Sequence, residues 1–407
     1  MPNLVQIEHN PPTYDNGIGL YLHVPFCQTK CPYCDFNTYA GIEDQIPAYL
    51  RALKRELEGW GELLSHPPVR TIFFGGGTPS YLPVGDISEI QSTIRTSFGI
   101  VDAAEITMEC NPGDVSLENA KAWLGSSINR ISMGVQSFDD GLLKLLGRRH
   151  TAIEAKQAFS TLRSAGFRNL SIDLIYGLPY QTVEQWSDTL DETIALDAEH
   201  ISLYGLQIEQ RTPLAVDVEA GKYPVPDDDL AADMYEEAQR RLGANGFEQY
   251  EISNWAKQGQ KSQHNLIYWL NEPYLGVGPG AHSWIDGQRF ANLKSPRRYV
   301  DIVNDDYEAN GSNPVASMQT PVGPVEQVEE TTPAVDIAET MMMGMRLNGG
   351  VAHKRFEKRF GRQINDVFPQ ELKRLLKLGL IEVTDDAVLL SERGRLLGNE
   401  VFAEFIG

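Results

Sequence analysis

The stretch His23-Val-Pro-Phe-Cys27-Gln-Thr-Lys-Cys31-Pro-Tyr-Cys34 sets three cysteines within eight residues, directly after an apolar run that predicts a strand at Leu20–Val24. An odd, tight group of cysteines does not form a disulfide framework, which favours a reducing setting with thiolates as ligands. A C-x3-C-x2-C loop can wrap three thiolates around three irons of a cubane cluster. Because iron–sulfur clusters normally take four cysteine ligands, the fourth iron is then open to a substrate.

An open iron suits the amino and carboxylate groups of S-adenosylmethionine (SAM). One electron passed into its sulfonium would break a C–S bond and yield a 5′-deoxyadenosyl radical. Structural zinc is the alternative, but zinc sites usually take four ligands in two pairs, and the sequence has no second cysteine pair. His23 could complete a tetrahedron, although it lies inside the predicted strand. The fourth cysteine, Cys110, is more typical of a small buried hydrophobe than of a ligand.

Downstream of the cysteine loop, short apolar runs alternate with helix-like stretches as far as about Gln207. In Ile46–Leu64, for example, apolar residues recur at a helical period. This alternation predicts right-handed β/α units on a parallel sheet, and six units favour a partial (β/α)6 TIM-like barrel. The further predicted strands are Thr71–Phe74, Glu105–Glu109, Arg130–Val135, Leu170–Ile175 and Ile201–Leu206, and further predicted helices include Thr151–Ala165, Val183–Leu196 and Asp227–Gly243.

Polar or glycine-rich motifs follow the predicted strands, at the edge where ligands of parallel α/β barrels bind. Glycines can expose backbone groups to an amino-acid moiety, carboxylates can accept hydrogen bonds from an ammonium or from ribose hydroxyls, and an arginine can pair with a carboxylate. A glycine triplet alone usually marks a tight turn, but beside a thiolate cluster these motifs together indicate a cofactor site. They are Gly75-Gly76-Gly77-Thr78-Pro79, Glu109-Cys110-Asn111-Pro112-Gly113, Gly134-Val135-Gln136-Ser137-Phe138, Arg148, and Asp173 with Gly177-Leu178-Pro179.

The composition is that of a globular chain with a strong negative charge. In its 407 residues, 35 Lys and Arg stand against 56 Asp and Glu, a net charge of −21. Such a surface repels phosphate backbones and anionic lipids, which argues against a nucleic-acid partner. No apolar run is long enough to span a bilayer, and the polar start of the chain lacks a secretory signal, so we expect a cytoplasmic protein.

We expect five segments along the chain: an N-terminal tail (1–18), the partial barrel (19–245), a Gly- and aromatic-rich barrel extension (246–303), an acidic, Pro-containing linker (304–333) and a C-terminal domain (334–407). The linker composition cannot bury much surface. In the last segment, helical patterns precede a short hairpin, which predicts a small, α-rich, winged-helix-like domain. Its expected elements are Ala334–Met345, His353–Phe360, Asn365–Leu378, Ile381–Thr384 and Val388–Leu390.

Together these residues resemble the radical SAM superfamily, and more narrowly the oxygen-independent coproporphyrinogen III oxidase group, over nearly the whole chain. The resemblance implies that Cys27, Cys31 and Cys34 hold a [4Fe–4S] cluster. It also implies SAM contacts, in the order and at the intervals of the group's motif, from Tyr21, Gly76, Gly77, Thr78, Glu109, Gln136, Arg148 and Asp173.

One departure separates the chain from the oxidases of that group, which carry a further cysteine two residues after the third cluster ligand. Phe36 stands at that position here. With His264-Asn265-Leu266-Ile267-Tyr268-Trp269, it resembles the HemW subfamily of heme chaperones, which binds heme, passes it to heme-requiring respiratory proteins and lacks the oxidase activity. The resemblance therefore implies heme as a further cofactor and client proteins as partners, with a homodimer and transient membrane contact as options. The resemblance leaves open whether the chain is also an enzyme.

The heme contacts that the resemblance implies are His264, Asn265, Tyr268 and Trp269. An imidazole can ligate heme iron, and Tyr and Trp rings can stack on a porphyrin. The alternative is a buried, hydrogen-bonded histidine beside ordinary aromatic packing. His282 is a second candidate ligand, with a turn-capping role as its alternative. The other candidate function is oxidative decarboxylation of coproporphyrinogen III to protoporphyrinogen IX by a coproporphyrinogen dehydrogenase-like enzyme.

Overall fold

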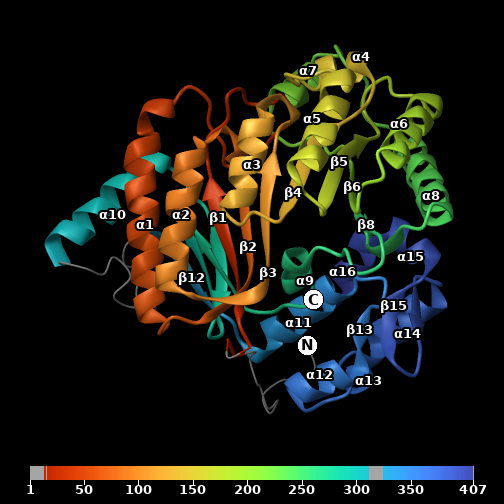
Figure 1. Cartoon of the computed structure of the whole chain (residues 1–407). Helices are drawn as coiled ribbons and strands as arrows, with labels where there is room; N and C mark the ends of the chain where they lie inside the picture. Colours follow the sequence, from red (N-terminus) through yellow and green to blue (C-terminus); the bar gives the residue numbers. More distant parts are fainter. Residues whose placement is uncertain (1–12, 15, 311–323, 407) are drawn as a thin grey trace.

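The computed structural model describes residues 13, 14, 16–310 and 324–406 (Figure 1). Within these residues the main sheet has twelve strands in the order β12-β11-β10-β9-β1-β2-β3-β4-β5-β6-β8-β7. The strands β1 to β6 are parallel neighbours in chain order, which confirms the predicted partial barrel of six β/α units. They are β1 (Ile18–Val24), β2 (Pro68–Gly76), β3 (Gly99–Cys110), β4 (Arg130–Gln136), β5 (Leu170–Tyr176) and β6 (His200–Gly205).

Six short strands extend this sheet at both ends. At one end β9 pairs in parallel with β1, and β10, β11 and β12 follow in antiparallel order. At the other end β8 and β7 pair antiparallel beside β6. The extension therefore belongs to the same sheet as the barrel. These strands are β7 (Glu248–Glu251), β8 (Asn254–Ala256), β9 (Tyr274–Val277), β10 (His282–Ile285), β11 (Gln288–Asn292) and β12 (Val325–Glu330).

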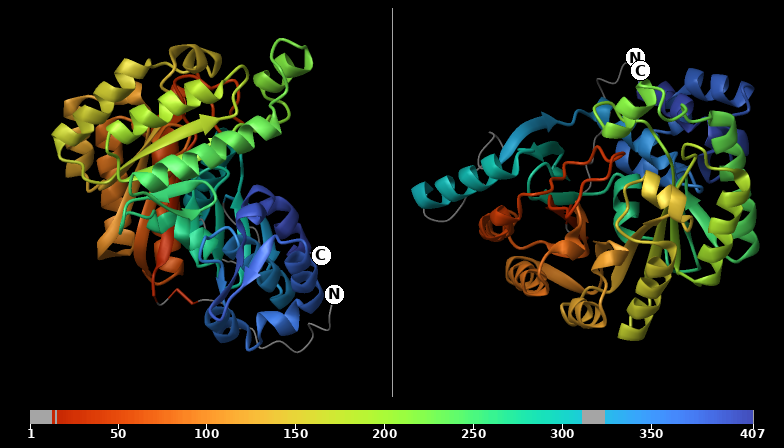
Figure 2. Two further views of the ribbon diagram at one scale, coloured as in Figure 1. Left: turned by 90° about the vertical axis from the view of Figure 1, so that its right-hand side faces the viewer. Right: turned by 90° about the horizontal axis from the view of Figure 1, so that it is seen from above.

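Helices cover the outer face of the curved sheet, as the view from above in Figure 2 shows. Thr151 and Thr182 each begin a helix with a capping box, in which the side chain and the third helical residue satisfy each other's backbone N–H groups. The helices before the C-terminal domain are α1 (Ile46–Leu63), α2 (Val84–Ser97), α3 (Leu117–Gly125), α4 (Asp140–Leu145), α5 (Ala152–Ala165), α6 (Val183–Ala195), α7 (Pro213–Glu219), α8 (Asp228–Ala244), α9 (Gln263–Trp269) and α10 (Pro296–Asn310).

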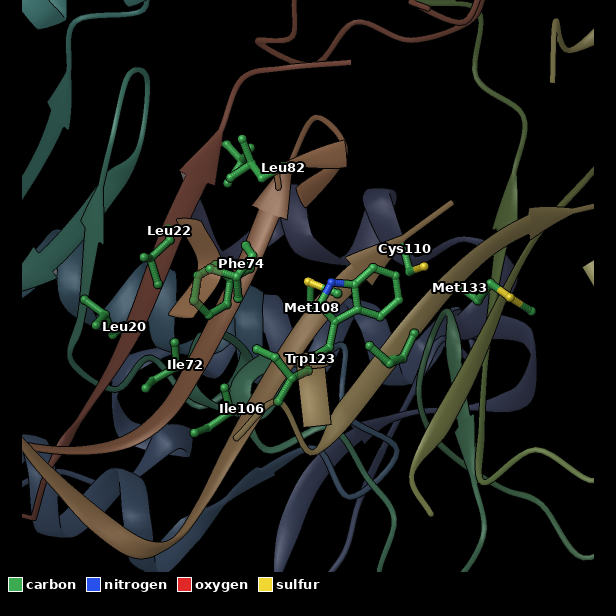
Figure 3. Close-up of a cluster of buried hydrophobic side chains, with 14 of the residues drawn as sticks. Leu20, Leu22, Ile72, Phe74, Leu82, Ile106, Met108, Cys110, Trp123 and Met133 are labelled. Carbon is green, nitrogen blue, oxygen red and sulfur yellow. The ribbon is translucent and has the colours of Figure 1, made fainter. Parts of the chain in front are cut away.

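The main core lies between the parallel strands and these outer helices (Figure 3). Alternate residues of β2 and β3, such as Ile72, Phe74, Ile106 and Met108, point to the side of the sheet where Trp123 of α3 packs. Strands buried on both faces read as apolar runs, which is why the sequence predicted them. The core fixes the strands, and thereby the carboxyl-terminal edge from which the site is built.

The C-terminal domain packs helices around a three-stranded antiparallel sheet and a second core, as expected for a winged-helix-like module. One predicted helix, Asn365–Leu378, is two helices here, because Pro369 has no N–H to continue the first and begins the second. The elements are α11 (Pro333–Gly344), β13 (Val351–Ala352), α12 (His353–Phe360), α13 (Ile364–Val367), α14 (Pro369–Lys377), β14 (Ile381–Val383), β15 (Ala387–Leu390), α15 (Glu392–Leu396) and α16 (Gly398–Ile406).

A buried ion pair docks this domain onto the barrel. Asp336 is fully buried on α11 and accepts hydrogen bonds from Arg359 Nε at 2.9 Å and from Asn271 Nδ2, in the loop after α9, at 2.8 Å. Nearby, Leu347 forms a β-bridge with Glu251, and Asn348 N donates to Tyr250 O at 3.0 Å. The domain is thereby held against α9 and β7.

The tail and the linker expected from the sequence fall largely outside the described residues, at 1–12, 15 and 311–323. Of the linker's remainder, 304–310 belong to α10, and 325–330 form β12, which pairs with β11. Among the helices of the described residues, none has both the length and the apolar composition needed to cross a membrane.

Candidate functional site

The cysteine loop, residues 27–34, leaves the carboxyl end of β1 and is fixed at its base by hydrogen bonds. Cys27 N donates to Tyr39 O at 2.9 Å. Lys30 Nζ donates to the carbonyls of Phe36 and Thr38 at 3.0 and 3.1 Å. The loop therefore presents its three thiols from a defined backbone. Phe36 itself is 64% exposed.

Each of the three thiols has a polar partner from the chain. Thr78 Oγ1 donates to Cys27 Sγ at 3.5 Å, and Arg148 Nη1 donates to Cys31 Sγ at 3.5 Å. Cys34 Sγ lies 4.0 Å from Thr38 Oγ1. Burial raises the pKa of the Cys27 and Cys34 thiols, whereas the hydroxyl contacts act in the opposite direction. These donors stabilise thiolates, the form that binds iron.

The glycine turn after β2 brings backbone against the cysteine loop. Gly77 N donates to Val24 O at 2.7 Å, and Thr78 N donates to Phe26 O at 2.8 Å. A Cβ on Gly77 would lie 2.6 Å from Phe26 O, and Gly76 has a φ of 105° that other residues rarely adopt. Glycine is therefore required at both positions, in agreement with the prediction that the glycine motif lets backbone groups come close to a neighbouring group.

Two buried carboxylates face the same space. Glu109 Oε2 accepts a hydrogen bond from Gly76 N at 3.0 Å, and Asp173 accepts from Ser132 Oγ at 2.9 Å. Burial, reinforced by the charge of Asp173, raises the pKa of Glu109 to about 8. Burial also raises the pKa of Asp173. Two carboxylates with raised pKa values at one cavity favour a cationic ligand, which would stabilise both in their charged form.

Gln136 and Arg148 come from the end of β4 and the loop after α4. Gln136 has a φ of 71°, a strained backbone conformation for a residue with a side chain, at a break in the β4–β5 register. Arg148 Nη2 donates to Gly134 O at 2.5 Å while Nη1 contacts Cys31 Sγ. Arg148 thus joins the end of β4 to the cysteine loop.

A cavity of about 920 Å³ connects these groups, a volume at the upper end of ordinary ligand pockets. Most of the site residues predicted from the sequence line it: Cys27, Cys31, Cys34, Gly76, Gly77, Thr78, Glu109, Gln136, Arg148, Asp173, Asn265, Tyr268 and Trp269. Two predicted residues, Tyr21 and His264, are not among its lining residues. Tyr21 instead donates toward His23 Nδ1 at 3.1 Å and stacks on Phe73.

Helix α9 carries the predicted heme contacts and turns its histidine away from the cavity. His264 is buried, with Nδ1 2.7 Å from Thr71 Oγ1 and Nε2 2.8 Å from Tyr268 OH. Burial lowers the pKa of His264 to about 3, so the ring is neutral. Both nitrogens are hydrogen-bonded, so iron ligation would require a contact to break. His282, the second candidate, is exposed at the start of β10 and outside the cavity lining.

Several cavity residues were not predicted from the sequence. Tyr204, Glu251 and Asn254 come from β6, β7 and β8, and Arg346 comes from the C-terminal domain. Arg346 follows the methionine-rich end of α11, where a single cation after an apolar run is a weak signal. Only the docking of the C-terminal domain brings it to the barrel, and no local pattern predicts that docking.

Two family models match separate parts of the chain. Residues 21–193 match the model of the Radical SAM superfamily, and residues 331–397 match that of the HemN C-terminal domain.

Full-length relatives are similar over nearly all of the chain. It is 38% identical over 388 residues to the heme chaperone HemW of Bacillus subtilis (strain 168), covering 95% of this chain and 98% of that protein. It is 33% identical to the heme chaperone HemW of Mycobacterium tuberculosis (strain ATCC 25618 / H37Rv), covering 99% and 98%. The structure of coproporphyrinogen III oxidase (HemN) from Escherichia coli, a radical SAM enzyme, has the same fold, with a TM-score of 0.81 at 22% identity over 99% and 95% of the two chains.

The residues at the cysteine loop fit a [4Fe–4S] cluster with bound SAM. In the described part of the chain, no three His, Cys, Asp or Glu side chains converge on one point as a single metal ion requires. A cubane cluster needs no such convergence, because each thiolate binds a different iron. All four cysteines are free thiols that line the cavity, and the three of the cysteine loop lie there with the two buried carboxylates and Arg148.

Proposed function

The chain belongs to the HemW family of the radical SAM superfamily, and on that premise we propose that it is a heme chaperone. It binds heme, delivers it to heme-requiring proteins, and carries a [4Fe–4S] cluster and SAM. Among its curated relatives, those of Bacillus subtilis and Mycobacterium tuberculosis bear this function in their names.

The observation that carries the proposal is one cavity lined by two different groups of side chains, which we call its first or cysteine end and its second or α9 end. The cysteine end comprises three cysteine thiols and two buried carboxylates, and the α9 end comprises Asn265, Tyr268 and Trp269 of α9. The first end has the chemistry of a cluster with SAM. The second offers aromatic faces with polar edges, the combination that suits a porphyrin. A chain that only cleaved SAM would have no use for the second end.

At the first end, Cys27, Cys31 and Cys34 hold the cluster, which when loaded and reduced supplies one-electron chemistry at SAM. The backbone of Gly76 and Gly77 lines the space for the amino-acid part of SAM. Glu109 and Asp173 bind its ammonium and ribose hydroxyls as hydrogen-bond acceptors, and Gln136 and Thr78 complete the polar wall. Arg148 pairs with its carboxylate, while Tyr21 stacks on Phe73 of β2 outside the cavity lining.

At the second end, Tyr268 and Trp269 contact the porphyrin and Asn265 contacts its polar edge. His264 acts on this end through Tyr268: its Nε2 lies 2.8 Å from the tyrosine hydroxyl and fixes that ring, which meets the imidazole edge-on. Delivery takes place by direct contact with a client, with transient membrane contact where the client is membrane-bound. A cytoplasmic location and a homodimer belong to the same proposal.

Anaerobic heme titration tests the proposal directly. Protein reconstituted with iron and sulfide should give a saturable Soret shift and should pass heme to the apo-form of a heme protein. A Tyr268→Ala, Trp269→Ala double variant should lose the shift. Tyr180→Ala, which removes an exposed aromatic ring outside the cavity lining, is the matched control and should bind as wild type does.

An activity assay on the same sample decides between the chaperone function and oxidative decarboxylation of coproporphyrinogen III. With reductant, SAM and coproporphyrinogen III, we expect no protoporphyrinogen IX. Sustained turnover to that product, or wild-type protein without saturable heme binding, would contradict the chaperone function.

A further inference from the structure

The cavity end formed by the C-terminal domain carries an arginine stacked on an indole. The guanidinium of Arg346 lies over the ring of Trp269, 4.4 Å from its centroid, and its Nη2 lies 3.5 Å from Glu251 Oε2. The β-bridge between Leu347 and Glu251 fixes the backbone next to Arg346. Figure 1 shows how this is possible: α9, which ends in Trp269, lies beside α11 of the C-terminal domain.

Two hydrogen-bond donors at this end have no partner among the described residues. Arg346 Nε and Trp269 Nε1 are both buried atoms without an acceptor. Buried donors left unpaired are costly and therefore uncommon in folded proteins. Both residues line the cavity, so a ligand bound there can supply an acceptor once their side chains turn these N–H groups toward it.

The neighbouring carboxylate leaves the guanidinium free for a second anion. Glu251 Oε1 accepts hydrogen bonds from Ser253 N at 2.7 Å and from Asn254 Nδ2 at 2.5 Å, whereas its contact with Arg346 is long at 3.5 Å. Burial also raises the pKa of Glu251, which weakens its repulsion of a second carboxylate. A planar guanidinium is suited to bidentate pairing with a carboxylate while it stacks on an aromatic ring.

We propose that Arg346 and Trp269 anchor a carboxylate of the bound ligand, and that this carboxylate is a propionate of heme. The inference rests on the proposed heme-binding function and adds that the C-terminal domain supplies part of the heme site. SAM is the other carboxylate source in the same cavity. Its carboxylate is assigned to Arg148 beside Cys31, at the cysteine end, which leaves Arg346 for the porphyrin.

Binding of heme, compared with binding of heme dimethyl ester, distinguishes a heme propionate from the SAM carboxylate as the group that Arg346 anchors. In the ester both propionates are blocked, so a carboxylate anchor cannot act on it. We expect Arg346→Gln to weaken heme binding about ten- to a hundredfold, as for loss of a charged hydrogen bond, and to leave ester binding unchanged. Trp269→Phe keeps the ring and removes the N–H, and it should show the same selectivity with a smaller loss. SAM affinity should not change in either variant.

Arg355→Gln is the matched control, since Arg355 also joins the two domains, through Glu272 and Leu270 O, but does not line the cavity. It should bind heme, ester and SAM as wild type does. Equal losses for heme and ester in Arg346→Gln, or wild-type heme affinity in both Arg346→Gln and Trp269→Phe, would overturn the inference. A loss for SAM alone would assign the anchor to SAM. Wild-type protein that binds no heme would instead refute the proposed function, and the inference with it.

Discussion

The two ends of the cavity are built in different ways. At the cysteine end, each thiol has a partner from the chain, and the supporting groups come from consecutive strand ends of one sheet. At the α9 end, the lining comes from α9, from the β7–β8 hairpin and from a second domain. Buried donors without a partner among the described residues occur at both ends, Arg148 Nε at the first and Arg346 Nε and Trp269 Nε1 at the second. The first end is therefore built by one sheet, whereas the second is assembled across a domain contact.

Removing the cluster ligands should produce the largest effect and should be confined to the first end. Replacing Cys27, Cys31 and Cys34 together with Ala should leave almost no cluster iron after reconstitution, because a cubane needs these thiolates. SAM should then no longer bind measurably, while heme should still shift its Soret band. Iron content and parallel titrations check this, with Cys110→Ala as the control that retains its iron. Loss of heme binding in the triple variant would show that the ends are not independent.

Breaking the buried ion pair of the C-terminal domain should affect the second end. Asp336→Asn leaves Arg359 buried without its charged partner, a change that typically costs about 3–5 kcal/mol. We expect a lower melting temperature and weaker heme binding, because Arg346 loses its fixed position, with SAM binding retained. The exposed pair of Lys54 and Glu89 is the control: Glu89→Gln should leave the melting temperature close to that of wild type, because an exposed ion pair contributes little to stability. Unchanged heme affinity in Asp336→Asn would separate the heme site from the domain contact.

The pH dependence of SAM binding should sharpen the description of the first end. The pKa of Glu109 is raised to about 8, so much of this carboxyl group is protonated at neutral pH. An acceptor for the SAM ammonium must be ionised, so SAM affinity should rise, up to about twentyfold, from about pH 6.5 to about pH 8.5. Glu109→Gln should bind SAM more weakly and without this rise. A flat wild-type profile would remove Glu109 from the ammonium contact.

The smallest expected effect concerns His264. Its ring bridges Thr71 and Tyr268 in a buried position, so His264→Gln should lower the free energy of unfolding by about 1–3 kcal/mol. The Soret maximum of the heme complex should stay in place, with affinity reduced only a few fold as Tyr268 loosens. Absorption spectra of wild type and variant check this. A displaced Soret maximum would mean that His264 leaves Thr71 and Tyr268 to ligate iron.

The sequence predicts the parts of the molecule that depend on local patterns better than the parts that depend on contacts between distant residues. Strands buried on both faces and helices with regular apolar spacing are local patterns, so β1 to β6 were all located, although β2 and β3 are longer than predicted, and α1, α5, α6 and α8 were predicted nearly to the residue. The short strands β7 to β12 were not, because their pairing depends on residues far away in the chain. Likewise, one of the two hydrogen-bond partners of the His264 ring is Thr71, 193 residues away, which the motif around the histidine does not reveal.

The strand-end residues of the cysteine end could be predicted because parallel strands bring their carboxyl ends to one edge. Arg346 could not, since it reaches the cavity only because the C-terminal domain docks on the barrel, through contacts such as that of Asp336 with Asn271 and the β-bridge of Leu347 with Glu251. Residues contributed across a domain contact leave no periodic trace in the sequence.

The most direct test is the electron paramagnetic resonance spectrum of the reduced, reconstituted protein, recorded with SAM, with heme and with both. We predict that SAM changes the cluster signal through the open iron, and that saturating heme neither prevents this change nor lowers SAM affinity. A cluster signal indifferent to SAM, or heme that displaces SAM, would contradict a single cavity with two separate binding ends.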